Sequence, residues 1–328
     1  MAITYRMNTD ADEAALVDLW TRHSDWGSLT VDEWEHKFLR TPGGPATFVL
    51  AVEDDTQEIV AQTAYVPYPI VANGHEITAF RPFGIIVNES FRSKSGFLRM
   101  QQMVIKMYTM AADQFASQGV DLLFMMPDPR WSRIVKMMPF FQTTTFPLWS
   151  HPLPLSQPEP LPSGYAVAPI EPGDARIDEL WQQAAGLYRC MVTRDTRTLP
   201  WKISHGAYQL FGVSHQGQLV GFFASIAKRK DNQWLLTDMV TADNHAALQA
   251  TLRAACLVVQ EQYERLPEED RVAYRKIAVL STPPMEPVLQ QLGFQRDKYD
   301  FLLVVHALNK KLTKEQVSPA QWYVSAND

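Results

Sequence analysis

The sequence of 328 residues has little of what marks a secreted, membrane-bound or zinc-binding protein. It contains two cysteines, Cys190 and Cys256, which are too few for a disulfide framework or a four-ligand zinc site. No apolar run approaches the ~20 residues that a bilayer span requires, and the first residues lack the pattern of a signal peptide. We therefore expect a cytoplasmic protein with no membrane partner and no metal site.

Positive charge is also scarce. The chain has 30 Lys and Arg against 36 Asp and Glu, and a net charge of −6. A non-specific nucleic-acid binder needs a basic face to neutralise phosphates, so no nucleic-acid partner is expected. Hydrophobic residues make up 46% and charged residues 20%, which is typical of a globular chain with enough apolar surface to fold.

Prolines gather at one place in the chain. Six of the 22 lie between Pro147 and Pro162, where each removes a hydrogen-bond donor and fixes φ. Because the length suits two domains, we predict a first domain over 1–148, a linker over 149–162, a second domain over 163–310 and a tail over 311–328. The alternative is a proline-rich loop inside one domain.

The two halves show the same order of strand and helix patterns. A strand before the long helix ends at Val87 in the first half and at Val240 in the second. In each half a phenylalanine, Phe140 or Phe294, follows the short helix. From the end of the strand to this phenylalanine there are 53 residues in the first half and 54 in the second. The matching order predicts a duplicated, mixed α/β fold, with a central mixed sheet flanked by helices in each half.

The basic turn before the first long helix carries a motif. Residues 87–97 read VNESFRSKSGF, and 288–295 read VLQQLGFQ. The first stretch resembles the Val-x-Pro-x-x-Arg-x-x-Gly-x-Gly/Ala motif of the GNAT N-acetyltransferase superfamily, and the second resembles the short helix and Gly-Phe of that family. Ser95 and Phe97 stand at the two glycine places, and Gly96 is displaced by one. The stretches 194–211 and 318–328 resemble GNAT-like proteins of polysaccharide and cell-wall synthesis.

This resemblance implies an N-acyltransferase that moves an acyl group from acetyl-CoA or another acyl-CoA to an amine of a small molecule or sugar. It implies that the basic turn holds the pyrophosphate of the co-substrate, where helix amides, the helix dipole and two cations converge. The residues implied in this role are Val87, Arg92, Ser93, Lys94, Ser95, Gly96 and Phe97. The counterpart at 241–248 has no Lys or Arg and presents Asp243, so we expect only the first half to bind.

Catalytic groups are harder to name. Amine acylation needs a base, and the carboxylates available near the motif are Glu76 and Asp128, although Asp128 also suits a helix N-cap. The place of the tyrosine that the family often uses as an acid is Val135. Tyr65, Tyr68, Arg81 and Trp131 are candidates to line the acceptor cleft.

Two other classes stay open. One is a Fem-type aminoacyltransferase, which would need a basic groove for aminoacyl-tRNA. The other is a non-catalytic GNAT-like protein that only binds a ligand, which the altered glycines and the missing tyrosine favour. Arg92, Lys94 and Gly96 count against the non-catalytic class. The partner that the resemblance implies is a small-molecule amine.

Overall fold

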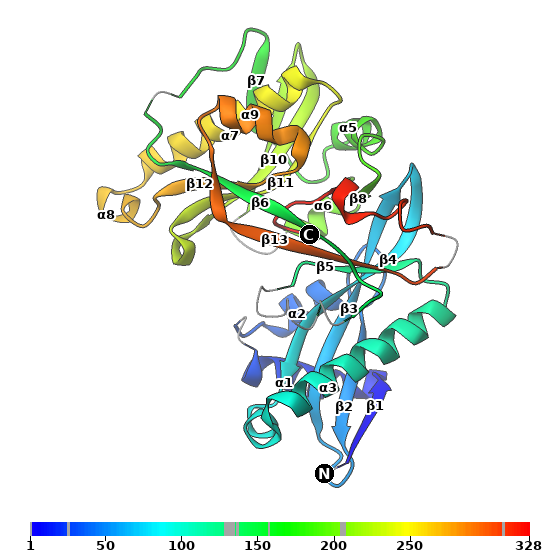
Figure 1. The fold of residues 1–328 in the computed structure, drawn as a ribbon. Helices are drawn as coiled ribbons and strands as arrows, with labels where there is room; N and C mark the ends of the chain where they lie inside the picture. The colour runs from blue at the N-terminus through cyan, green and yellow to red at the C-terminus, as the bar shows by residue number, and fades with distance from the viewer. Residues whose placement is uncertain are drawn as a thin grey trace. The chain divides into compact units, whose positions relative to one another are not determined.

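The chain forms two compact units (Figure 1). The computed structural model describes residues 2–24, 27–127, 135, 138–156, 158–203, 208–309 and 312–328, without the side chain of Phe97. Unit 1 comprises Met1–Ile70, Glu76–Gln142 and Val304–Ser318, and unit 2 comprises Val71–His75, Thr143–Leu303 and Pro319–Asp328. The predicted ranges differ from these units at residues 71–75 and 143–148, which belong to unit 2, and at residues 304–310, which belong to unit 1.

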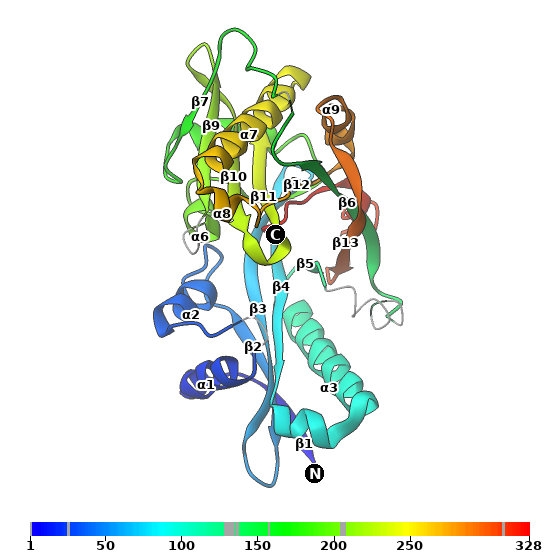
Figure 2. The ribbon, with the colours of Figure 1, turned by 90° about the vertical axis from the view of Figure 1, so that its left-hand side faces the viewer.

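Unit 1 is a mixed sheet with helices on both faces. Its strands follow the order β1, β2, β3, β4, β5 and the end of β13. Their bounds are Ile3–Met7, Thr47–Glu53, Ile59–Ala72, His75–Val87, Leu122–Met125 and Gln295–Ala307. Figure 2 shows α1 (Glu13–His23) and α2 (Val31–Phe38) on one side of β2 to β4 and α3 (Glu89–Ser117) on the other. No helix in the described part of the chain is long and apolar enough to cross a membrane.

Local sequence signals explain these helices. Thr30 and Glu33 have the spacing that predicts a capping box at the start of α2, and the structure confirms it: Glu33 N–H donates to Thr30 Oγ1 over 3.2 Å, and Thr30 N–H donates to Glu33 Oε2 over 2.8 Å. Apolar residues three and four apart predict the long helix, and Met103, Met107 and Phe115 are indeed buried in one core between α3 and the sheet.

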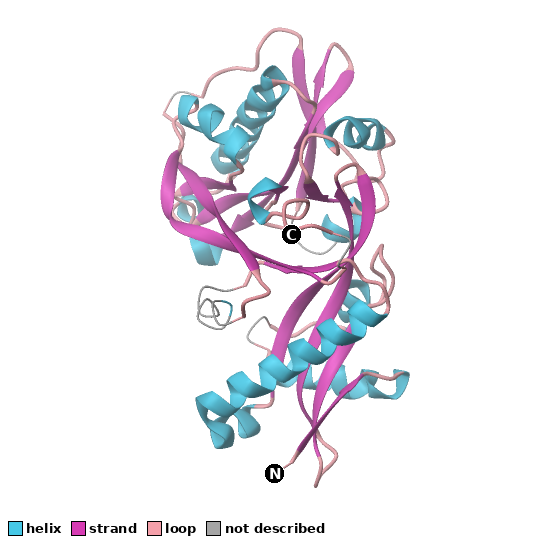
Figure 3. Ribbon diagram, turned by 45° about the vertical axis from the view of Figure 1, so that its right-hand side comes forward, coloured by secondary structure: helices cyan, strands magenta, loops and turns pink. Residues whose placement is uncertain are grey.

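Unit 2 repeats the arrangement. Its strands follow the order β7, β9, β10, β11, β12, β6 and the start of β13. The bounds of the first six are Tyr165–Pro169, Gln209–His215, Gln218–Lys228, Gln233–Thr241, Lys276–Leu280 and Gln142–Pro152. Figure 3 shows helices on both sides of these strands; they include α5 (Arg176–Ala184), α7 (His245–Arg265) and α9 (Glu286–Gln291). The short elements are α6 (Leu199–Ile203), α8 (Glu268–Arg271), β8 (Cys190–Val192) and β14 (Trp322–Tyr323), and β8 pairs with β14.

The proline-rich stretch begins inside a strand. The prolines predict that neither a helix nor a central strand runs through 147–162. This prediction is wrong for the first residues, because β6 continues to Pro152 and pairs antiparallel with β12 from Leu148 to Pro152. A proline removes only its own donor. Pro147 still accepts a hydrogen bond from Ser281 N–H over 3.0 Å, so the ladder between the two prolines persists.

Candidate functional site

The parallel strands β4 and β5 pair over a short distance. Their register joins Ala79 to Leu122 and Phe80 to Leu123, and β4 then runs on to Val87. Among the described residues, β4 has no further pairing with β5. Residues 81–83 are only partly buried although β4 lies between two other strands. We call residues 81–87 the β4 edge, because none of them pairs with β5 in the described part of the chain.

The β4 edge leads directly into α3. Asn88 caps the helix: its Oδ1 accepts from Ser90 N–H over 2.9 Å, and its Nδ2 donates to Glu58 Oε1 over 2.7 Å. Asn88 N–H also donates to Val60 O over 2.9 Å. The start of α3 is thereby fixed to β3, and Val87 is buried just before it.

Gly96 interrupts α3 at the predicted phosphate motif. The sequence predicted a turn before a helix starting near residue 96, whereas residues 89–95 are already helical and Gly96 has φ 70° and ψ 161°. This backbone conformation favours glycine. A Cβ at Gly96 would meet no atom within 4 Å, so the space beside it is open. The helix kinks where an anion could approach the backbone.

Uncompensated positive charge surrounds this kink. Arg92, Ser93 and Lys94 are exposed, and within the described ranges neither cation has a carboxylate partner. Ser95 Oγ is buried and has no hydrogen-bond partner there. Cations in the first turns of a helix are repelled by the positive end of the helix dipole. An anion bound beside them would be attracted both by the cations and by the dipole.

The two tyrosines predicted to line the acceptor cleft lie on opposite faces of β3. Tyr65 is buried beneath α3, with its ring centre 5.3 Å from that of Phe115, and burial raises the pKa of its hydroxyl. Tyr68 packs edge-on against Phe124 at 5.5 Å. Residues three apart on a strand point to opposite faces, so the structure does not bring Tyr65 and Tyr68 together.

Tyr68 instead meets Arg81. Arg81 Nη1 donates to Tyr68 Oη over 3.5 Å, and the guanidinium carbon lies 5.4 Å from the ring centre of Phe83. Lys37 Nζ lies 4.2 Å from the same ring centre. Partial burial and then the charge of Arg81 lower the pKa of Lys37 to about 8. Sequence reasoning missed Lys37; the available signal was Trp34, one helical turn earlier on the sheet-facing side of α2.

Among the described residues, the predicted catalytic carboxylates are not seen beside Arg81 and Lys37. Glu76 is exposed near the start of β4, before the pairing with β5. Asp128 and Trp131 lie outside the described residues, and Val135 is buried. In the part of the chain that is described, no cluster of three or more His, Cys, Asp or Glu side chains could hold a metal ion.

Unit 2 has an equivalent edge that is covered. β11 pairs with β12 as far as Leu236 with Val279. At the next residue, Thr237 O accepts a hydrogen bond from Asn327 N–H over 3.1 Å, and Met239 O accepts one from Tyr323 Oη. The 319–328 segment therefore lies along residues 237–241, which we call the β11 edge.

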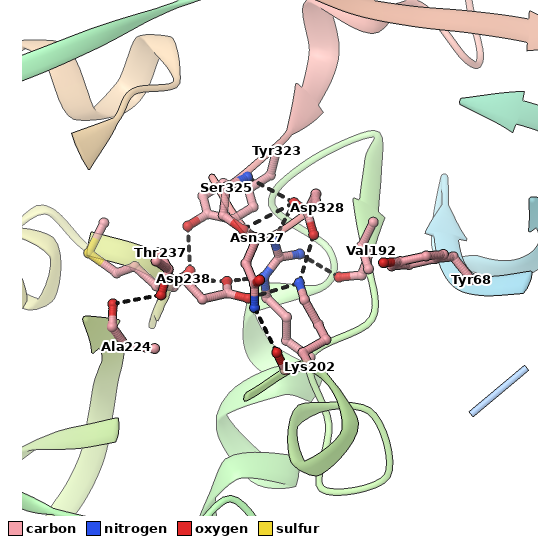
Figure 4. Close-up of polar contacts among 12 residues, drawn as sticks. Tyr68, Val192, Lys202, Ala224, Thr237, Asp238, Tyr323, Ser325, Asn327 and Asp328 are labelled. Carbon is pink, nitrogen blue, oxygen red and sulfur yellow. Dashed lines mark hydrogen bonds and ion pairs between the residues drawn. The ribbon is translucent and has the colours of Figure 1, made fainter. Parts of the chain in front are cut away.

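A buried ionic network fixes this segment (Figure 4). Arg194 Nε pairs with Asp238 Oδ1 and its Nη2 with Asp328 Oδ2, both at 2.6 Å. Lys202 Nζ lies 2.8 Å from Asp238 Oδ2 and 2.7 Å from Asp328 Oδ1. Burial opposes the charge on Asp328, but Arg194 and Lys202 outweigh it and hold the pKa of that carboxyl below its usual range.

Solved structures share this architecture. No protein-family model and no curated protein matches the sequence. A GCN5-related N-acetyltransferase from Anabaena variabilis is similar with a TM-score of 0.67 and 13% identity, over 94% of this chain and 73% of that one. A tandem GNAT protein from the clavulanic acid biosynthesis pathway is similar with a TM-score of 0.57 and 12% identity, over 94% of this chain and 99% of that one. Saccharomyces cerevisiae N-myristoyltransferase, solved with myristoyl-CoA, is similar with a TM-score of 0.56 and 13% identity, over 94% of this chain and 79% of that one.

These likenesses define the class of fold. The chain has a tandem GNAT fold, as the sequence predicted, with a mixed α/β sheet flanked by helices. At 12–13% identity the likeness concerns the fold, and the chemistry has to be argued from the site.

Proposed function

We propose that unit 1 is an acyltransferase that transfers an acyl group from an acyl-CoA to an amine. The observation that carries this proposal is the β4 edge, which has no pairing with β5 beyond Phe80 in the described residues and lies beside Arg92 and Lys94. The equivalent edge of unit 2 is covered by the 319–328 segment. We therefore assign acyl-CoA binding to unit 1 alone.

The start of α3 would hold the phosphates. Arg92 and Lys94 supply charge, and the unpartnered Ser95 Oγ supplies a hydroxyl donor. Gly96 supplies a backbone that an anion can approach, because a Cβ built there would meet no described atom within 4 Å outside its two chain neighbours. Val87, Ser93 and Phe97 flank these groups in the sequence. The extended arm of the co-substrate would follow residues 81–87 as an added strand.

Acyl-CoA supplies an activated thioester carbonyl. The amine nitrogen attacks that carbon, the new C–N bond forms and the C–S bond breaks, and coenzyme A leaves as the thiolate. The proton released by the amine passes to a base, for which Glu76 and Asp128 are the carboxylates we propose, and the thiolate is protonated from solvent.

A calorimetric titration with acetyl-CoA, coupled to an assay for free thiol with a panel of amines, tests this proposal. We expect acetyl-CoA to bind wild type and Arg22→Ala equally, since Arg22 is an exposed arginine of α1 paired with Asp18. Arg92→Ala should bind more weakly. Amines should then release coenzyme A from the wild-type complex.

The outcomes separate the alternatives. Absence of acetyl-CoA binding would contradict the proposal and would favour a different donor, such as aminoacyl-tRNA. Binding without thiol release for any amine would favour a non-catalytic binding protein, which the buried Val135 at the place of the family's tyrosine also favours.

A further inference from the structure

Two cations of unit 1 surround one aromatic ring, and no carboxylate among the described residues balances them. Lys37 Nζ lies 4.2 Å and the Arg81 guanidinium carbon 5.4 Å from the ring centre of Phe83. Both side chains are partly buried. Neither forms an ion pair with a carboxylate in the described ranges of the chain. The two positive charges therefore repel each other in surroundings that have lost part of their water.

This arrangement costs folding free energy. Partial burial disfavours each charge, and the charge of one cation disfavours that of the other. The ring face offsets some of this cost, but an aromatic ring does not neutralise a cation. A bound oxyanion would, because guanidinium and ammonium groups both form strong hydrogen bonds to carboxylate and phosphate oxygens.

The cluster adjoins the proposed acyl-transfer site. Arg81 is the first residue of β4 after its pairing with β5 ends at Phe80. Its guanidinium is oriented by Tyr68 Oη at 3.5 Å. Trp20 stacks on Phe83 with ring centres 6.1 Å apart and an interplanar angle of 8°, which gives the cluster an apolar floor. A ligand held here would lie next to the β4 edge.

We propose that Lys37 and Arg81 form an anion-binding subsite for the acceptor, so that the acceptor is an amine that also carries a carboxylate or phosphate group. This inference rests on the proposed function, since it identifies the acceptor of that reaction. Lys37 and Arg81 determine specificity, and Tyr68 positions the guanidinium of Arg81.

Matched pairs of amines test the subsite. With saturating coenzyme A present, binding is measured by calorimetry for phenylalanine against phenylalaninamide, and for glucosamine 6-phosphate against glucosamine. We expect wild type to prefer the anionic member of one pair by about tenfold or more, and the responding pair identifies carboxylate or phosphate. Lys37→Met and Arg81→Met should lose that preference, and both variants should fold because each removes an unbalanced charge.

Lys106→Met is the matched control. Lys106 Nζ also lies over an aromatic ring, 5.7 Å from the ring centre of Tyr5, but this side chain is exposed and belongs to α3. It should keep the preference. Equal binding of both members of each pair by wild type, or a preference that survives in Lys37→Met and Arg81→Met, would overturn the subsite.

A second measurement separates this inference from the proposed function. In an Arg92→Ala background, which weakens the proposed coenzyme A site, acetate and inorganic phosphate are titrated at constant ionic strength with and without Lys37→Met. Loss of anion binding on adding Lys37→Met supports the subsite even if acetyl-CoA never binds. Anion binding that is unchanged by Lys37→Met overturns the subsite even if acetyl-CoA binds well.

Discussion

The two units carry the same edge of the same fold and use it differently. In unit 1 the parallel pairing stops at Phe80, and the β4 edge continues beside a helix start that bears Arg92 and Lys94. In unit 2 the pairing stops at Leu236, and the backbone N–H of Asn327 and the hydroxyl of Tyr323 hydrogen-bond to carbonyls of the β11 edge. We propose that the duplicated fold keeps its topology while this short segment determines which copy accepts an extended ligand.

Charge compensation distinguishes the units in the same way. Arg194 and Lys202 of unit 2 are completely buried at their charged ends and are balanced by Asp238 and Asp328. Arg92 of unit 1 has no such partner in the described residues. Removing one partner from a balanced buried network is strongly destabilising, whereas cations without a carboxylate partner in the described residues favour binding of an anion from outside.

The largest effect should come from breaking the network of unit 2. Arg194→Met leaves Asp238 and Asp328 buried with only Lys202 to balance them, and should destabilise unit 2 by about 3–5 kcal/mol. Denaturant unfolding followed by hydrogen exchange of β11 measures the loss.

Arg296→Met is the control for that variant, because the Arg296–Asp300 pair is exposed and should contribute less than about 1 kcal/mol. Equal stability losses in the two variants would show that burial of the network is unimportant for unit 2.

Arg92→Ala should weaken acetyl-CoA binding by about 1.5–3 kcal/mol, the usual size for a hydrogen bond to a charged group. Added salt should weaken the wild-type complex too, because the start of α3 is exposed. Asp243→Ala, at the corresponding place in unit 2, should bind like wild type. The comparison would be reversed if Asp243→Ala changed the affinity and Arg92→Ala did not.

Acid should destabilise unit 1 through His306. Its Nδ1 lies 3.0 Å from Tyr108 Oη, its ring stacks on Phe140, and burial lowers its pKa to about 4. The folded state resists protonation, so this contribution is complete above about pH 6.5 and is lost as the pH falls towards 4. Because the ring is partly exposed, we expect a loss of about 1–2 kcal/mol.

The free energy of unfolding measured between pH 7 and 4 tests this expectation. His306→Phe should show a flatter profile in that window. A wild-type profile with the same slope as His306→Phe would mean that the histidine titrates as it does in the unfolded chain.

The smallest effect should come from Ser95→Ala. Its hydroxyl has no partner in the described residues, so removing it should leave stability within about 0.5 kcal/mol of wild type, as for ordinary substitutions. Acetyl-CoA affinity should fall by about 0.5–1.5 kcal/mol, the value of one hydrogen bond. A clear loss of stability with unchanged affinity would give Ser95 a structural role instead.

Much of the fold was predictable because its signals are local. The capping box at Thr30 and the apolar spacing of α3 each lie within a few residues of sequence. The positions of β6 and β13 were not predictable in this way. Each strand is placed by partners more than a hundred residues away, as Leu148 with Leu280 and His306 with Leu123 show, and period-2 patterns do not encode the choice of partner.

The candidate site was partly predictable. Motif spacing predicted a binding role for Arg92 and Lys94, which the structure leaves exposed, and strand parity could have separated Tyr65 from Tyr68. The pairing of Arg194 with Asp328 across 134 residues had no sequence signal, because an isolated charge does not identify its partner.

Hydrogen exchange with and without acetyl-CoA tests the central claim most directly. We predict protection of backbone amides in peptides that cover residues 81–99, where the β4 edge meets α3, and no change in peptides that cover residues 237–248 of unit 2. Protection of residues 237–248, alone or together with 81–99, would contradict the claim that the 319–328 segment reserves binding for unit 1.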